Sequence, residues 1–180
     1  MGVGTKGESG MNEQELQALI ESWGAMGALW GINRSMARVH ALLITSEVPV
    51  SLDEVAERLE ISRGNASMCL KELRSWGVIK RLYERGDRRD YYVTEPDIWS
   101  MFFRILGERK KREFDPVLTA LNATLEPTPA GAEPDNSPVR ARLEQMRELL
   151  STLDKLATRF LADEKSSKAM LDFLVGMGPR

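Results

Sequence analysis

The sequence is poor in the residues that build redox and metal sites. Cys69 is the only cysteine and His40 the only histidine among 180 residues. A single cysteine excludes an intrachain disulfide or a cysteine zinc cluster, and one histidine cannot build a metal site by itself. We therefore expect no metal and no cofactor. Cys69 is interpreted as a small buried hydrophobe rather than a redox sensor, and His40 as a packing or surface residue.

Long apolar runs are also missing. No stretch of the chain approaches the roughly 20 apolar residues that a bilayer-spanning helix needs. Residues 1–10 are Gly-rich and polar, without the basic start and apolar stretch of a secretory signal. The length suits one domain, or one small domain with helical extensions. We expect a soluble, cytoplasmic protein without a membrane partner.

The formal net charge is small, at −2, but the charge is distributed unevenly along the chain. Residues 58–112 carry fourteen Lys and Arg against eight Asp and Glu, whereas the segments before and after carry −5 and −3. Attraction of phosphate needs local rather than global positive charge. The central third is therefore a candidate nucleic-acid face, although such charge runs are often only solvated surfaces.

Two short helices are predicted in this central third. Ser51-Leu-Asp-Glu54 is a capping box, which predicts a helix to about Leu59. Ser62 caps the next helix, and Gly77 is suited to the left-handed position that ends it. One apolar stripe along this second helix is formed by Ala66, Cys69, Leu70, Leu73 and Trp76.

A hairpin is predicted directly after the second helix. Residues 78–84 and 90–94 are rich in Val, Ile and Tyr, and residues 85–89 between them contain a Gly-Asp pair with turn chemistry and three arginines. Helix, tight turn, helix and basic hairpin, in that order within about 45 residues, are the arrangement of a winged helix-turn-helix domain. The sequence thus places a DNA-reading head at residues 51–94.

Helices are predicted on both sides of the head. Residues 12–46 carry two helical patterns with a break near 31–33, and residues 98–121 carry one, with a kink expected at Pro116. The last helix, 139–162, has a heptad seam widened by Leu149 and Leu156. The seam consists of Leu143, Met146, Leu150, Leu153, Ala157 and Phe160.

These patterns predict a mainly α protein with a small β-hairpin, in which helices flank a winged helix-turn-helix domain. We divide it into a disordered tail (1–11), the DNA-binding domain (12–95), a connecting helix (96–123), a linker with four of the eight prolines (124–138) and C-terminal dimerisation helices (139–175). Pairing of the heptad helix within its own subunit is the alternative to pairing between subunits.

The helix from Ser62, at residues 62–76, is the candidate recognition helix. With its apolar stripe inward, its outer side is polar or small and can approach a major groove about 12 Å wide. Arg63 would pair with guanine or phosphate, Asn65 would read adenine, Ser67 would donate to either, and Met68 would touch a thymine methyl. The expected contact set of this helix is Ser62, Arg63, Gly64, Asn65, Ser67, Met68 and Lys71.

The basic hairpin is expected to act as the wing. Its tip would straddle the DNA backbone or enter the adjacent minor groove, with Asp87 orienting an arginine. Lys80 and Arg81 are expected phosphate partners. The tip residues assigned to DNA are Arg85, Arg88 and Arg89.

Four segments resemble the GbsR family of MarR-like regulators over about residues 13–122. They are Ile61-Ser-Arg-Gly-Asn-Ala-Ser-Met-Cys-Leu-Lys-Glu-Leu73, Trp76-Gly-Val-Ile79, Gly86-Asp-Arg-Arg89 and Glu108-Arg-Lys-Lys-Arg-Glu-Phe-Asp-Pro116. The resemblance implies a homodimeric repressor or activator, in a bacterium or archaeon, that binds an operator through two winged domains. The best-known members of the family respond to choline-type osmolytes. One departure is Glu60, where such turns often carry Gly or Asn.

The aromatic residues Trp23, Trp30, Trp99 and Phe102, with Phe103, could form a cage for a quaternary ammonium ligand. Ordinary core packing is the alternative and the one we favour. The hypothesis keeps a small-molecule effector as a possibility and assigns it no identity.

The sequence is interpreted as that of a sequence-specific transcriptional regulator, most simply a repressor, that binds double-stranded DNA as a homodimer. The alternative is a winged-helix protein-interaction module that assembles a complex without reading DNA. An enzyme is not expected, because no nucleophile–base pair, phosphate loop or carboxylate pair of recognisable spacing is present.

Overall fold

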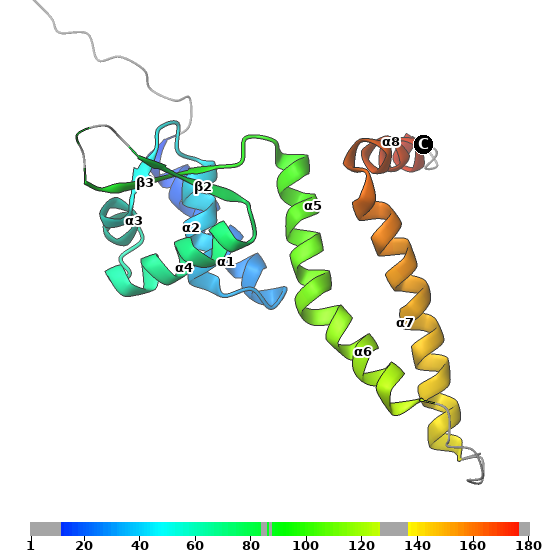
Figure 1. Ribbon diagram of the computed structural model, residues 1–180. Helices are drawn as coiled ribbons and strands as arrows, with labels where there is room; N and C mark the ends of the chain where they lie inside the picture. Colours follow the sequence, from blue (N-terminus) through cyan, green and yellow to red (C-terminus); the bar gives the residue numbers. More distant parts are fainter. Residues whose placement is uncertain (1–11, 84–85, 87, 127–136, 177–180) are drawn as a thin grey trace, which may run out of the picture. The chain divides into compact units, whose positions relative to one another are not determined.

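The computed structural model describes residues 12–83, 86, 88–126 and 137–176. The chain divides into two compact units, Met1–Pro96 and Asp97–Arg180, and each is described by itself (Figure 1). Helices dominate both units, and one small sheet lies in the first. The predicted fold class, a mainly α protein with a winged helix-turn-helix domain, is confirmed.

The first unit begins with two helices, α1 (Glu13–Leu29) and α2 (Arg34–Ile44). The chain turns between them at Gly31, whose φ of +79° is accessible to glycine at little steric cost. Asn33 caps α2 by accepting a hydrogen bond from the backbone N–H of Met36. The predicted pair of helices and the break between them are confirmed.

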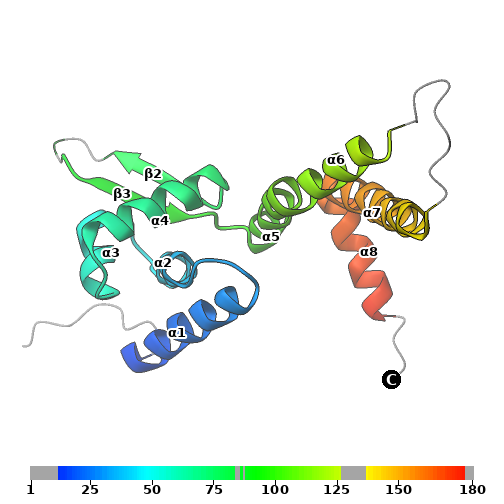
Figure 2. The ribbon, with the colours of Figure 1, turned by 90° about the horizontal axis from the view of Figure 1, so that it is seen from below.

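The helices α3 (Leu52–Arg58) and α4 (Arg63–Ser75) follow. Figure 2 shows that α1, α2, α4 and the hairpin succeed one another across the unit. The buried residues of this core come from all of these elements. They include Ile20, Val39, Leu42, Leu43, Val50, Val55, Leu59, Leu70, Leu73, Val78 and Tyr92.

The sheet of the first unit has three antiparallel strands in the order β1-β3-β2. The strands β2 (Ile79–Tyr83) and β3 (Asp90–Thr94) form the predicted hairpin, with Ile79 opposite Thr94. The short strand β1 (Val50–Ser51) pairs with β3 through Val50 and Tyr92. The sequence analysis predicted only the hairpin, because a strand of two residues is too short to show an alternating pattern.

The second unit starts with α5 (Ile98–Arg109), a π-helical turn (Lys110–Phe114) and α6 (Asp115–Thr124), which follow one another without a break. The π turn precedes Pro116, near the predicted kink. Proline has no N–H to donate, and its ring crowds the carbonyl four residues earlier. A wider turn at this point keeps the chain helical across the proline.

The unit is completed by α7 (Pro138–Ala162) and α8 (Glu164–Gly176). α7 packs against α6 and α5, and α8 packs against α5 and α7 (Figure 1). Lys110 joins the helices through ion pairs of 2.7 Å with Asp115 and with Asp154 of α7. Of the predicted linker, residues 127–136 lie outside the described residues, as does the predicted tail up to residue 11.

The heptad helix α7 has apolar residues on two faces. Leu143, Leu150, Ala157 and Phe160 are half-buried, and the ring of Phe160 lies 5.2 Å from that of Phe103 in α5. A second row on α7 is exposed instead. It consists of Met146, Leu149, Leu153 and Leu156.

The α7 rows show that the heptad seam packs partly within the subunit. Part of its apolar surface is left uncovered by the described residues. Within the described ranges, no helix has the length and apolar character needed to span a bilayer.

Candidate nucleic-acid interface

The helix-turn-helix is built around two caps. The backbone N–H of Ser51 donates to the Glu54 carboxylate at 2.7 Å, and the N–H of Glu54 donates to Ser51 Oγ at 3.3 Å. The side chain and the backbone N–H of Ser51 both hydrogen-bond the Glu54 carboxylate and lower its pKa, because they stabilise the ionised form. At the start of α4, Ser62 Oγ accepts from the N–H of Asn65 at 3.1 Å. Both predicted caps are confirmed.

The turn between α3 and α4 passes through Glu60, whose φ of +53° lies in the left-handed region. A residue with a side chain occupies this region at a cost of about 1–2 kcal/mol. Val55 and Leu59 are buried beside the turn, and the N–H of Ile61 donates to the carbonyl of Ala56 at 3.0 Å. The tight turn therefore forms despite the unfavourable residue, and packing on either side holds it.

The recognition helix α4 has a strongly divided surface. Its inner side, formed by Ala66, Cys69, Leu70 and Leu73, is buried, and the helix ends at Gly77 with φ +70°. Burial raises the pKa of the Cys69 thiol, which keeps it neutral and unreactive at ordinary pH.

The outer side of α4 is exposed. Met68 is 68% exposed, and a Cβ added to Gly64 would meet no atom within 4 Å. The exposed residues are Arg63, Gly64, Ser67, Met68 and Lys71, together with the cap Ser62.

Arg63 forms an ion pair with Asp53 of α3, with Nη1 and Oδ1 3.2 Å apart. Both side chains are more than half exposed, so the pair is worth little and can be exchanged for another anion. Arg63 therefore remains available at the first turn of α4.

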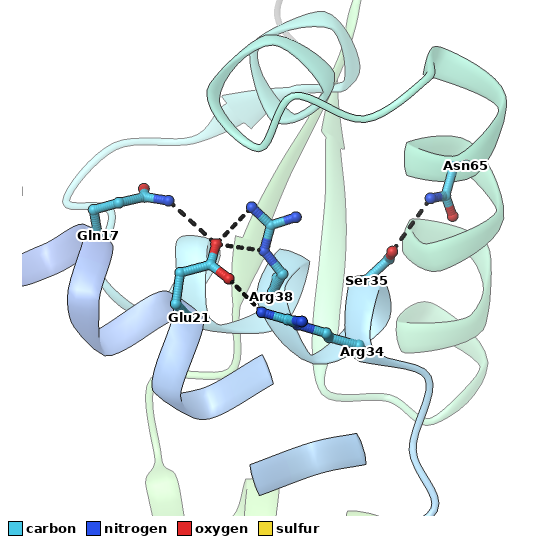
Figure 3. Close-up of polar contacts among 6 residues, drawn as sticks. All are labelled: Gln17, Glu21, Arg34, Ser35, Arg38 and Asn65. Carbon is cyan, nitrogen blue, oxygen red and sulfur yellow. Dashed lines mark hydrogen bonds and ion pairs between the residues drawn. The ribbon is translucent and has the colours of Figure 1, made fainter. Parts of the chain in front are cut away.

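Asn65 lies differently from its neighbours on α4. It is half-buried, and its side-chain amide donates to Ser35 Oγ of α2 at 3.3 Å (Figure 3). The sequence analysis placed Asn65 on the flank of the reading face, but the helical angle alone did not reveal the hydroxyl of α2 beside it.

The wing is carried by β2 and β3. Arg88 and Arg89 are exposed, and the guanidinium of Arg89 lies 5.3 Å from the centre of the Tyr91 ring. Gly86 has a φ of +94°, as the tight turn requires. Arg85 and Asp87, the other assigned tip residues, lie outside the described residues.

Lys80 and Arg81 point to opposite faces of β2 and have different surroundings. Lys80 is paired with Glu95 at 3.2 Å, but its side chain remains 60% exposed. Arg81 is less exposed, forms an ion pair with Asp90 and stacks on the Tyr83 ring at 4.6 Å. Of the two predicted phosphate partners, the structure thus leaves Lys80 accessible and engages Arg81 within the sheet.

Tyr83 was not among the residues predicted for the interface. Its side chain is 75% exposed at the end of β2, beside Arg81. A phenol on a wing can donate to a phosphate oxygen. Its place two residues before the basic turn was the available sequence signal, but strand propensity explained the tyrosine equally well.

His40 is buried in α2. Burial lowers its pKa to about 4, and its Nε2 has no hydrogen-bond partner among the described residues. The side chain is therefore neutral near pH 7. Its placement is that of a packing residue, one of the two placements expected from the sequence.

The residues of the predicted aromatic cage are divided between the two units. Trp23 is half-buried and Trp30 exposed in the first unit. In the second, the rings of Trp99 and Phe102 lie 6.3 Å apart, and Lys168 Nζ lies 5.2 Å from the Trp99 ring. The structure brings together Trp99 and Phe102, whose neighbour Phe103 is buried between them and Phe160.

Comparison with known proteins agrees with this geometry. Residues 30–90 match the MarR family. The HTH-type transcriptional repressor GbsR of Bacillus subtilis is 28% identical over 109 residues, which are 61% of this chain and 60% of that protein. The repressor OpcR of the same organism is 24% identical over 95 residues, or 53% of this chain and 51% of that protein. The chain thus spans between half and three fifths of these relatives.

A solved structure described as a transcriptional regulator shares the fold. It matches with a TM-score of 0.61 and 22% identity over 82% of this chain and 95% of that one. The resemblance expected from the sequence is therefore confirmed. The relatives are named as transcriptional repressors, and neither name describes an enzyme.

Proposed function

From the match of residues 30–90 to the MarR family, we propose that the protein is a sequence-specific DNA-binding transcriptional regulator that acts as a homodimeric repressor. In this proposal α4 enters the major groove, and the wing at residues 85–89 contacts the backbone or the adjacent minor groove. The observation that carries the proposal is the exposed outer side of α4, which is small or polar except at Met68, above a buried inner side.

The outer side of α4 suits close approach to base edges. Gly64 adds no side chain, and the exposed Ser67 and Met68 can reach a base acceptor and a thymine methyl. Lys71, one turn further along, is placed for a phosphate. With Gly64 in its first turn and no aromatic residue among its exposed side chains, this surface suits a groove about 12 Å wide.

Positive charge surrounds this face. Arg63 at the start of α4 and Arg88 and Arg89 on the wing are exposed, and Lys80 is accessible on β2. Phosphate contacts from such residues fix the register of a protein on the duplex, whereas base contacts specify the sequence. Charge and reading residues thus occur together in the first unit.

The homodimer is supported by the exposed row of α7. Met146, Leu149, Leu153 and Leu156 recur at spacings of three, four and three residues, which is the spacing of a coiled-coil seam. A second copy of the same helix would cover the row, and two heads related by two-fold symmetry would then meet two half-sites.

The same apolar row also favours a second candidate, a protein-interaction module, because the row would equally cover a different protein. The two candidates differ in what they bind. The module predicts stable co-purification with a protein partner and no retardation of any genomic DNA fragment.

A small organic cation is proposed as effector of the regulator. The support is the contact between Lys168 Nζ and the Trp99 ring, which shows an ammonium group seated on that aromatic face beside Phe102. A thermal-shift screen with choline-like compounds tests this part. Saturable stabilisation that is lost in Trp99→Ala supports it, and the absence of a shift for every compound removes the effector from the proposal.

The central proposal is tested by fluorescence anisotropy with a labelled fragment from upstream of the protein's own gene, against a scrambled fragment of equal length. We expect tighter binding to the upstream fragment and an affinity that falls steeply and log-linearly with salt. Failure to bind any fragment of the genome, even at low salt, would contradict the proposal.

A further inference from the structure

The side chain of Asn65 is already occupied inside the protein. Its Nδ2 donates to Ser35 Oγ at 3.3 Å, and its Oδ1 accepts from Cys69 Sγ at 3.5 Å. Its backbone N–H is taken by the Ser62 cap. Asn65 is also half-buried, unlike Arg63, Gly64 and Ser67 around it. Both ends of the amide therefore have partners in the absence of DNA.

These contacts oppose a role for Asn65 in reading adenine. Reading adenine requires the amide to present its donor and its acceptor together to one base edge. Asn65 could do this only after breaking the contacts with Ser35 and Cys69 and leaving a half-buried hydroxyl without its partner. The exposed residues on either side face no such penalty.

Ser35 is a firmly held partner. It lies in the first turn of α2, which is capped by Asn33 at 3.1 Å. The Glu21 carboxylate of α1 pairs with Arg34 in this turn at 3.0 Å and with Arg38 one turn later at 2.6 Å (Figure 3). One carboxylate thus holds two arginines that flank Ser35 in the chain.

The close approach of α1 and α2 also holds Ser35 in place. A Cβ at Gly24 would lie 2.6 Å from Arg38 Cγ, and one at Gly27 would lie 2.6 Å from Ala37 Cβ. The two glycines therefore let α1 lie directly against α2. The Ser35 hydroxyl projects from a rigid helical pair toward the first turns of α4.

The hydrogen bond between Asn65 and Ser35 lies in the part of α4 whose position matters most for base contacts. Asn65 lies in the first turn of α4, the part that would enter the groove. Base contacts depend on hydrogen-bond distances, so a small shift of this turn would lengthen every contact that it makes. Ser62 fixes the end of α4 on its own backbone, and Arg63 forms an exposed ion pair with Asp53 of α3. Asn65 instead joins this turn to α2 through a part-buried hydrogen bond.

We infer that Asn65 is a positioning residue, which sets the first turn of the recognition helix against α2 through Ser35, and does not read a base. The inference rests on the proposed DNA-binding function and deepens it. It assigns sequence reading to the exposed Ser67 and Met68 and gives the α1–α2 pair a direct part in holding the reading head.

The test is a double-mutant cycle of Ser35→Ala and Asn65→Ala, measured as affinity for the operator and for a set of operators with single base-pair changes. Titrations are corrected for the fraction of folded protein, so that lost stability alone does not move the result. We expect each single variant to weaken operator binding by about three- to tenfold, as for one hydrogen bond, and the double variant to be no weaker than Asn65→Ala. No base pair should lose its discrimination selectively.

Two further variants act as controls. Ser35→Thr keeps the hydroxyl and should retain most of the affinity that Ser35→Ala loses. Ser67→Ala, on the exposed face two residues further along α4, should instead lose discrimination at one base pair. The inference is overturned if Ser35→Ala binds like the wild type, or if Asn65→Ala loses preference at a single position. If the wild type binds no DNA, the proposed function itself has failed, which is a different result.

Discussion

The two units of this protein differ in how completely each buries its own apolar surface. In the first unit α4 has an inner side that is buried and an outer side that is polar or small except at Met68. In the second, the longer helix α7 has no fully buried residue, and the row Met146, Leu149, Leu153 and Leu156 lies exposed along it. Both helices are amphipathic, but only the apolar inner side of α4 is covered by the rest of its own unit.

The difference indicates what each surface binds. Exposed polar and cationic groups around a small-residue helix suit phosphates and base edges. An exposed apolar row at heptad spacing suits another protein surface, because large apolar patches on soluble proteins mark interaction sites. The proposed contact with DNA thus rests on the first unit, and the proposed contact with a second subunit rests on the second.

The exposed row of α7 is expected to form the dimer interface, and substitutions there should have a large effect. Leu149→Glu combined with Leu156→Glu places four carboxylates in a symmetric dimer and removes the burial of four leucines. Each leucine contributes about 1.5–3 kcal/mol, so the dissociation constant should rise more than a thousandfold. Sedimentation velocity should show a monomer at micromolar concentration.

The matched control is Lys155→Glu, which changes the net charge by the same −2 on the exposed polar side of α7. It should stay dimeric. A dimer that survives both leucine substitutions would place the interface elsewhere and leave the apolar row unexplained.

The buried core of the first unit can be tested through pH. Burial lowers the pKa of His40 from 6.5 to about 4, so the folded unit keeps the imidazole neutral while the unfolded chain becomes protonated below pH 6.5. The unfolded state then binds more protons, and stability is lost as pH falls from about 6.5 toward 4. The full effect of such a shift is about 3 kcal/mol.

Urea unfolding of wild type and His40→Leu across pH 7.5 to 4 measures the effect as a difference between the two slopes. The variant should lose less stability over this range, because its residue 40 does not titrate. Parallel pH dependence in the two proteins would show that His40 is not shielded as the structure has it.

The positive charge of the first unit can be tested on the wing. Arg88→Ala with Arg89→Ala should weaken binding to all DNA sequences by about ten- to a hundredfold at low salt, and should reduce the salt slope by about two. Lys155→Ala with Lys165→Ala removes the same charge from the second unit. Equal effects of the two pairs would mean that net charge matters rather than the wing.

The elements that could be predicted are those whose signals are local. Ser51, Ser62 and Gly77 satisfy backbone groups within one turn of their own position, so the bounds of α3 and α4 could be derived from sequence alone. The heptad of α7 was visible in the same way. The division of α7 into a half-buried and an exposed row could not be predicted, because the spacing of its apolar residues does not tell which row α5 and α6 cover.

The details of the candidate site depend on contacts between distant parts of the chain. Ser35 and Asn65 are thirty residues apart, and the pairing of Arg81 with Asp90 requires the register of the hairpin. The angular position of residue 65 around the helix axis placed Asn65 within reach of DNA. Only the packing of α2 against α4 shows that its side-chain amide is hydrogen-bonded to Ser35. Glu60 is similar, because the packing of Val55 and Leu59 overrides its own backbone preference.

The smallest expected effect separates the two roles of α4 most cleanly. Gly64 lies in the first turn of α4 with open space around its missing Cβ, so Gly64→Ala should fold without a clash. Alanine loses less conformational entropy than glycine in a helix, and the free energy of unfolding should rise by about 0.5–1 kcal/mol. The added methyl points into the space that DNA would fill, so operator affinity should fall by a few fold. Stability from thermal unfolding and affinity from anisotropy would then change in opposite directions, whereas an exposed position without a DNA contact would gain stability and keep its affinity.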